Sequence, residues 1–180
     1  MTSYEYDEVY AARQIKRSRN PLRRFVKGFY LRDLLKDVVG PTIDFGCGAG
    51  QLLARLPEKS IGLEVNAALV KHLKRNKMNV QLYDPDLDRL SFASLKPNLY
   101  QTFVMSHVLE HFEDAAEGLR QILSACKRLG VRRVIVPVTV ADCHSDLVAC
   151  TTGDFRVGRA SGHCAKGQTY HRDRRHLQSY

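Results

Sequence analysis

The sequence predicts an α/β protein with a doubly wound, mostly parallel sheet and helices on both of its faces. Short apolar strands alternate with helical segments from residue 42 to residue 138. The first strand runs into a glycine-rich bend, and the second ends in an acid, Glu64. Such alternation favours a parallel sheet, because a parallel connection needs a crossover long enough for a helix. Right-handed crossovers then give the doubly wound order.

The strands are expected as short runs of apolar and β-branched residues, at 42–45, 61–65, 80–83, 102–106 and 133–138. Four helices are expected. Three of them cover residues 21–38, 67–77 and 115–129, and a further short one follows the glycine-rich bend. The first helix begins at Asn20-Pro21, because asparagine caps a helix start and proline is preset for its first turn. The last helix carries an unbroken apolar stripe and stops at Gly130, a residue that helix ends favour.

The chain divides into three segments. Residues 1–20 are polar and carry Tyr4, Tyr6 and Tyr10, and they form either a lid over a site or a frayed end. Residues 21–140 make the folded α/β domain, and a chain of 180 residues can bury a substantial core. Residues 141–180 are a basic tail that bears cysteines and histidines, and no helix or strand is predicted there.

Positive charge is concentrated in two stretches of the chain. The formal net charge is +9, and residues 13–36 contain nine Lys or Arg against one acid, Asp33. Residues 156–175 add six more against Asp173. Such charge suits nucleic acid, an anionic small substrate or a membrane surface as a partner, although a solvated basic surface would look the same.

The composition favours a cytoplasmic protein. The polar, acidic start does not resemble a signal peptide. No apolar run reaches the ~20 residues that span a bilayer, so no membrane span is expected. The five cysteines lack disulfide-framework spacing, which is typical of reduced thiols in the cytosol.

The bend Asp44–Gly50, with the sequence DFGCGAG, predicts a site for a nucleoside-containing cofactor. A dinucleotide fingerprint would place a third glycine where Gln51 stands. Asp44 would sit poorly beside a pyrophosphate but well beside an ammonium group. S-adenosylmethionine has an amino-acid tail, a sulfonium and a ribose, and it has no pyrophosphate. Glu64, at the end of the next strand, could hold the ribose diol, so the pattern favours S-adenosylmethionine.

These motifs resemble those of a class I, S-adenosylmethionine-dependent methyltransferase, from about Asn20 to Val138. DFGCGAG resembles the glycine-rich first motif of that family, and Glu64 falls where its ribose-binding acid stands. Tyr83-Asp84 resembles the third-strand end, and MSHVLEHFED, residues 105–114, resembles the fourth-strand segment of small-molecule methyltransferases. The resemblance implies a Rossmann-like fold. Parts of the chain are also similar to methyltransferase-like proteins of methionine biosynthesis, and others to members found in bacterial glycan and lipid pathways.

By this resemblance the cofactor would be bound by residues at the ends of four strands: Asp44, Phe45, Gly46, Cys47, Gly48, Gly50, Glu64, Val65, Asp84, Ser106 and His107. Two of these residues have an alternative role. Gly50 could serve only helix packing. Asp84 could be a cap or turn residue, with Asp86 or Asp88 in its place at the adenine.

His107 and His111 are the candidate catalytic residues, because a general base is needed where the acceptor must lose a proton. The alternative is that both histidines are structural residues at a helix entry.

The sheet is expected to lack the last two strands that the family usually has. Only 42 residues follow Val138, and RRHLQSY resembles the start of the helix that normally precedes the sixth strand. The fifth strand would then be an exposed edge, through which a homodimer could form.

The tail also carries possible metal ligands, but their spacing follows no familiar zinc pattern, so no metal is expected. These residues are Cys143, His144, Cys150, His163, Cys164, His171 and His176.

The function expected from this reasoning is transfer of a methyl group to a small-molecule acceptor, by in-line displacement at the sulfonium methyl. Two alternatives remain open. The chain could be a cofactor-binding regulatory or scaffold subunit without catalysis, or it could be an RNA methyltransferase whose basic helix, residues 22–38, follows the phosphates.

Overall fold

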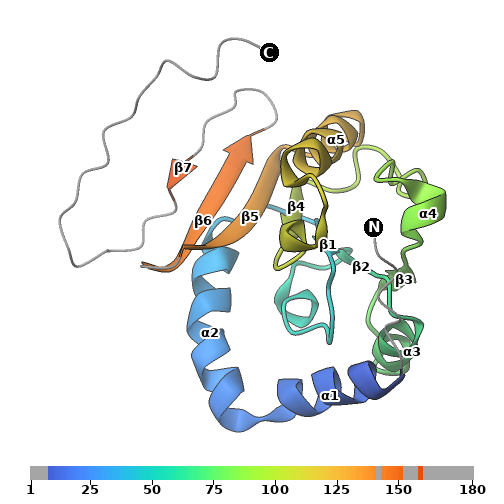
Figure 1. The fold of residues 1–180 in the computed structure, drawn as a ribbon. Helices are drawn as coiled ribbons and strands as arrows, with labels where there is room; N and C mark the ends of the chain where they lie inside the picture. The colour runs from blue at the N-terminus through green and yellow to red at the C-terminus, as the bar shows by residue number, and fades with distance from the viewer. Residues whose placement is uncertain (1–7, 141–142, 152–157, 160–180) are drawn as a thin grey trace.

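A computed structural model describes residues 8–140, 143–151 and 158–159, and it shows one sheet with the strand order β3-β2-β1-β4-β5-β6-β7 (Figure 1). Strands β1 to β5 are parallel, and β6 and β7 are antiparallel to their neighbours. The strands are β1 Thr42–Phe45, β2 Ile61–Glu64, β3 Val80–Leu82, β4 Thr102–Met105, β5 Arg133–Val140, β6 Cys143–Thr151 and β7 Gly158–Arg159. The predicted doubly wound parallel sheet is therefore confirmed for β1 to β5.

The helices lie where the sequence places them, with two additions at the N-terminus and after β3. They are α1 Glu8–Arg19, α2 Pro21–Lys36, α3 Ala67–Arg75, α4 Pro85–Asp88 and α5 Ala115–Arg128, with 3₁₀ turns η1 Leu53–Arg55 and η2 Leu109–His111. The Asn20 side chain caps α2 by accepting the Arg23 N–H at 3.1 Å.

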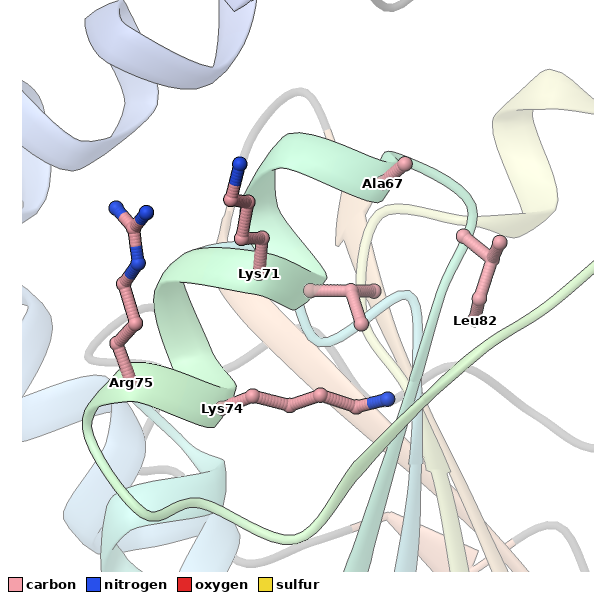
Figure 2. Close-up of a pocket in the computed structure, with 6 residues that line it drawn as sticks. Ala67, Lys71, Lys74, Arg75 and Leu82 are labelled. Carbon is pink, nitrogen blue, oxygen red and sulfur yellow. The ribbon is translucent and has the colours of Figure 1, made fainter.

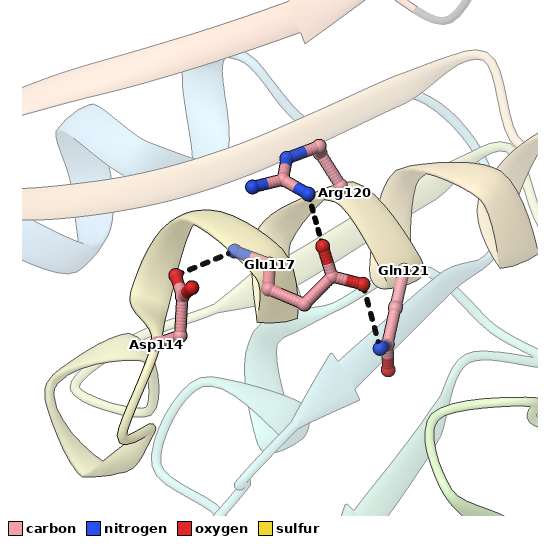
Figure 3. A network of polar contacts seen from close by, with 4 residues as sticks. All are labelled: Asp114, Glu117, Arg120 and Gln121. Carbon is pink, nitrogen blue, oxygen red and sulfur yellow. Dashed lines mark hydrogen bonds and ion pairs between the residues drawn. The ribbon is translucent and has the colours of Figure 1, made fainter.

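The N-terminus of α5 is closed by a network of side chains. Asp114 accepts the Glu117 N–H at 2.9 Å, and the Glu117 carboxylate in turn binds Arg120 and Gln121 (Figure 3). Capping satisfies N–H groups that have no partner within the helix, so the network fixes where α5 begins.

Successive side chains of the buried strands point to opposite faces of the sheet, so the core has one layer on each face. Phe45 and Phe103 point to the face that α5 covers through Ile122. Val104 points to the opposite face, where α2 packs through Leu31 and Leu34, and α3 covers the β2–β3 end of that second face. Asp44 lies between Ile43 and Phe45 in β1, so it points to the face that α2 covers.

The sheet continues past β5 into β6, and this corrects the expectation that β5 would be an exposed edge. Strand β6 pairs with β5 from Arg133 opposite Thr151 to Val140 opposite Cys143, so β5 is not an exposed edge and offers no free edge for a homodimer. The two strands follow each other directly, with no helix between them. An antiparallel hairpin needs no crossover. Strand β6 was not predicted because its sequence, CHSDLVACT, contains polar residues and lacks a continuous apolar run.

We predict that Phe103→Ala lowers the free energy of unfolding by about 3–5 kcal/mol, because it leaves a cavity inside the aromatic cluster of Phe45, Phe92 and Phe103. Phe103 is fully buried. Phe29→Ala, at an exposed phenylalanine of α2, is the matched control and should cost less than about 1 kcal/mol. Urea denaturation of both variants checks this. Similar losses in the two variants would contradict the assignment of the core.

Candidate functional site

A cavity of about 1180 Å³ lies at the carboxyl ends of the parallel strands. Its floor is formed by the ends of β1, β2 and β4 and by the glycine-rich loop after β1, and its walls come from α1 and α2. Open α/β sheets bind their ligands at this edge, because the loops that follow the strands meet there. The cavity is therefore the candidate site.

The glycine-rich loop is tied to β2 by its backbone. The N–H groups of Gly46 and Cys47 both donate to the Leu63 carbonyl, at 2.8 and 3.1 Å. Gly48 has φ +55, and a Cβ there would project into open space beside the cavity. The missing side chain leaves room for a ligand to reach the backbone.

Gly50 has a different surrounding from Gly48. Its φ is +74, and a Cβ would lie 2.6 Å from the Leu73 Cδ2 and 2.8 Å from the Met78 Sδ. Gly50 is not among the residues that line the cavity. The structure therefore favours the packing alternative for this glycine.

Asp44 is a buried carboxylate that lacks a full set of partners. Its Oδ2 atom has no hydrogen-bond partner among the described residues. Burial raises the pKa of the Asp44 carboxyl to about 7. The nearby Lys27 ammonium lowers this pKa, and the Glu64 carboxylate raises it further. Burying an unpaired charge is costly, so a cation or a hydrogen-bond donor bound at this oxygen would stabilise the carboxylate.

Glu64 connects the glycine-rich loop with the start of α3. Its Oε2 accepts the Gly48 N–H at 2.7 Å, and its Oε1 accepts the Asn66 N–H at 3.0 Å. Burial raises the pKa of Glu64, and these backbone hydrogen bonds oppose the rise. A carboxylate can accept about four hydrogen bonds, so Glu64 can bind a ligand without releasing the loop.

The third strand end differs in detail from the sequence expectation. Asp84 is the N-cap of α4 and accepts the N–H groups of Asp86 and Leu87, at 3.0 and 3.1 Å. It does not line the cavity, whereas its neighbours Tyr83, Pro85 and Asp86 do. Asp86 is therefore the third acid at the cavity, after Asp44 and Glu64. This agrees with the alternative given above, in which Asp84 is a cap and Asp86 takes its place.

The segment after β4 brings both candidate histidines to the cavity. Ser106, His107 and His111 all line it. His107 has φ +57, a conformation that is rare for a residue with a side chain. Its Nδ1 lies 3.4 Å from the Glu110 Oε1. Backbone strain of this kind is often found at functional sites.

Lys27 and Tyr30 of α2 are among the cavity residues that the sequence reasoning missed. The Lys27 ammonium lies near Asp44, and its pKa is lowered by desolvation although the residue as a whole stays exposed along the cavity. The Tyr30 hydroxyl lies 3.1 Å from the Ser106 Oγ. The helical spacing could have indicated Lys27, because Leu31 lies four residues after it and Leu34 three residues after Leu31, which places all three on one helix face.

Helix α1 forms one wall of the cavity. Tyr10, Gln14 and Arg17 line it, and the Gln14 Nε2 donates to the Tyr10 hydroxyl at 2.8 Å. The Gln51 Nε2 donates to the Ser18 carbonyl at 3.2 Å, which ties α1 to the glycine-rich loop. Residues 8–19 are thus helical, while Tyr4 and Tyr6 lie outside the described residues.

A second hollow, of about 500 Å³, lies on the outer surface between α3 and β3 (Figure 2). Its charged side chains are Lys71, Lys74 and Arg75, and Figure 2 shows Lys74 pointing toward the β3 side while Lys71 and Arg75 point elsewhere. Because these side chains do not converge on one point, the hollow is not a candidate catalytic site.

Within the described part of the chain, no group of three or more His, Cys, Asp or Glu could hold a metal ion. The side chains of the seven Cys and His residues of the tail lie outside the described ones. No described helix is both long and apolar enough to cross a bilayer.

The sequence and the fold both match known methyltransferases. Residues 43–131 match the family model described as a methyltransferase domain. No curated protein matches the sequence. The fold is similar to an S-adenosylmethionine-dependent methyltransferase from Archaeoglobus fulgidus, with 24% identity and a TM-score of 0.52 over 66% of this chain and 54% of that one.

The fold is also similar to the magnesium protoporphyrin IX methyltransferase of Synechocystis PCC 6803, solved with bound SAM. The identity is 16% and the TM-score 0.55, over 77% of this chain and 74% of that one. The expected class, a class I S-adenosylmethionine-dependent methyltransferase domain, is therefore confirmed. The chain spans about half the length of the archaeal protein.

We predict that Asp44 makes the stability of the chain fall as the pH rises from 5 to 8. Its pKa is about 7 in the folded state and 3.8 in the unfolded state, so between pH 3.8 and pH 7 the folded state binds a proton that the unfolded state has lost. The contribution of this proton is complete below pH 3.8 and is lost as the pH rises through about 7. Relative to Asp44→Asn, the wild type should lose about 2 kcal/mol of unfolding free energy over this range.

Urea denaturation at several pH values measures this difference. Asp33→Asn, at an exposed aspartate of α2, is the control and should keep the wild-type pH dependence. Parallel pH profiles for the wild type and Asp44→Asn would show that Asp44 is ionised throughout the range.

Proposed function

We propose that the chain binds S-adenosylmethionine at the acidic end of this cavity and transfers its methyl group to a small-molecule acceptor. The observation that carries the proposal is the buried Asp44 Oδ2, which has no hydrogen-bond partner among the described residues and lies near a second buried carboxylate, Glu64. Two buried acids are stabilised by a cation. S-adenosylmethionine carries both an ammonium and a sulfonium, so the residues present suit it.

Each part of the cofactor has a suitable place in the cavity. Asp44 would accept the ammonium, with the open backbone at Gly46 and Gly48 beside the methionine chain. Glu64 would accept both ribose hydroxyls while it still accepts the N–H groups of Gly48 and Asn66. Asp86, which lines the cavity, would accept the adenine amino group in the role first expected for Asp84. The remaining wall residues are Phe45, Cys47, Val65, Tyr83, Ser106 and His107.

When bound, S-adenosylmethionine supplies a methyl group that its sulfonium has already activated. The chain's own contribution is therefore mainly positioning, which can be worth ~7–11 kcal/mol in favourable cases. Asp44 and Glu64 would fix the two ends of the bound molecule. Helix α1 would act as a lid that keeps water out of the cavity, a role supported by its hydrogen bond to Gln51.

A proton on the acceptor would be taken by His107. The Nδ1 of this histidine faces the Glu110 carboxylate, which leaves Nε2 as the atom that accepts the proton. His111, one turn further along the same wall, is the second candidate. A positioned base of this kind contributes about 100- to 10,000-fold to a rate.

The opposite wall of the cavity suits an anionic acceptor. Arg17, Arg23 and Lys27 come from α1 and α2 and face the strand ends that carry the acids. The cationic groups of the cofactor would be held at the acidic end, so an acceptor with a carboxylate or phosphate would be attracted to the basic wall. We place this reaction in the cytoplasm, in keeping with the free, buried thiols of Cys47 and Cys126.

We predict that Glu64→Ala weakens binding of S-adenosylhomocysteine by about 10- to 100-fold, because it removes the acceptor for the ribose and releases the Gly48 N–H. Titration calorimetry measures the affinity. The control is Glu58→Ala, at an exposed glutamate outside the cavity, which should leave it unchanged. An unaltered affinity in Glu64→Ala would remove the basis of the proposal.

We predict that His107→Ala lowers the turnover number at least about 100-fold but changes the affinity for S-adenosylhomocysteine less than about twofold. Turnover is followed with labelled S-adenosylmethionine and a small-molecule extract that contains the acceptor. His72→Ala, at a histidine of α3 outside the cavity, is the matched control. Equal losses of turnover and affinity would reject the role of His107 as a base.

A further inference from the structure

Helix α2 presents a row of large apolar side chains to solvent. Leu22, Phe25, Val26 and Phe29 are 71%, 67%, 63% and 50% exposed. Their spacing of three and four residues places them on one face of the helix. The Phe25 and Phe29 rings pack edge to face, with centroids 5.0 Å apart, so the row is a continuous surface, here called the apolar stripe. The inner face of α2 is already buried through Leu31 and Leu34.

The apolar stripe is surrounded by positive charge. The nine Lys and Arg residues between Arg13 and Lys36 are all exposed. Only Lys36 among these nine forms an ion pair with a described residue, which is Asp33 at 2.7 Å. The Arg32 guanidinium lies over the Phe29 ring, 5.5 Å from its centroid, at the edge of the apolar stripe.

A basic helix with one exposed apolar face has the properties of a helix that lies in the surface of an anionic membrane. Its apolar side chains enter the boundary of the acyl chains, and each nearby Lys or Arg adds to the attraction for anionic headgroups. Nucleic acid would use the cations and the two phenylalanines, but Leu22 and Val26 offer no ring for a base to stack on. A second copy of the chain would bring the same nine cations against each other.

The apolar stripe also reaches the mouth of the cavity. Leu22 and Val26 belong both to the stripe and to the cavity lining, and Arg23 and Lys27 line the cavity beside them. A molecule embedded in a membrane under α2 could therefore pass along apolar side chains into the cavity and meet cations there. This path suits an acceptor with an apolar chain and an anionic head.

We propose that the outer face of α2 docks on an anionic lipid bilayer and that the methyl acceptor is an anionic amphiphile taken from it. The second half of this proposal rests on the proposed function, and the first half does not. Docking requires only the apolar stripe and the surrounding charge, so it can be measured without cofactor or turnover.

The experiment is cosedimentation of the full chain with vesicles of phosphatidylcholine alone or mixed with phosphatidylglycerol. The wild type should bind the anionic vesicles at least about tenfold more tightly than the neutral ones, and less tightly at high salt. The Phe25→Glu/Phe29→Glu double variant should lose at least about tenfold in binding to the anionic vesicles. Leu82→Glu/Leu87→Glu is the matched control: it changes two exposed apolar residues of β3 and α4 and adds the same charge, and it should stay within about twofold of the wild type.

Binding of S-adenosylhomocysteine by the same proteins separates the two proposals. Phe25 and Phe29 do not line the cavity, so the double variant should keep the wild-type affinity and unfolding midpoint. A wild type that binds S-adenosylhomocysteine but stays in solution with anionic vesicles would overturn the docking proposal and leave the proposed function intact. Vesicle binding that survives Phe25→Glu/Phe29→Glu would also overturn it. If the wild type does not bind vesicles, two further results would also contradict docking on a bilayer. One is binding to single-stranded RNA, and the other is a dimer that Phe25→Glu/Phe29→Glu abolishes.

Discussion

The site depends on a carboxylate that is buried at the end of β1 without a full set of partners. Strand alternation turns Asp44 toward the face of the sheet that α2 covers, and the strands on either side place Gly62 and Val104 next to it. These neighbours offer no charge to balance it, so its ionised form depends on Lys27 and on what enters the cavity. The glycine-rich loop, the Glu64 hydrogen bonds and the inner face of α2 all surround this one group.

The sequence was sufficient for the features that follow from short-range patterns. Parallel strands were predictable because each apolar run ends in glycine or in a polar turn, and Asn20-Pro21 and Gly130 mark helix ends by their backbone chemistry. Glu64 was predictable because its place depends only on where β2 ends. The cavity position of Asp86 was predictable only as one alternative, because it depends on Asp84 acting as the cap of α4.

Other features depend on tertiary packing and could not be derived from local patterns. Lys27 and Tyr30 enter the site only because α2 lies across the end of β1 and β4. Strand β6 has a polar, cysteine-bearing sequence, and pairing with β5 determines its conformation more than its own residues do. The positive φ of His107, two residues after the end of β4, is likewise not visible in the local sequence.

Helix α2 combines two surfaces with different tasks. Its inner face supplies leucines to the core and a lysine to the carboxylate, while its outer face is apolar and exposed. A soluble helix usually needs only one apolar face. An apolar face that is left exposed lowers solubility unless some binding partner covers it. The proposed bilayer would be such a partner, because it would cover the apolar face and attract the surrounding cations.

The strand order also determines how the chain can fold. Strand β1 lies between β2 and β4, with Thr42 beside Thr102, although much of the domain separates them along the chain. Closing such a long loop costs entropy before any pairing is gained, so the central register should form late and limit the folding rate. The β5–β6 hairpin, by contrast, joins neighbours in sequence and can form locally. The cavity is built on the slowly formed centre of the sheet, so ligand binding should become possible only at the last stage of folding.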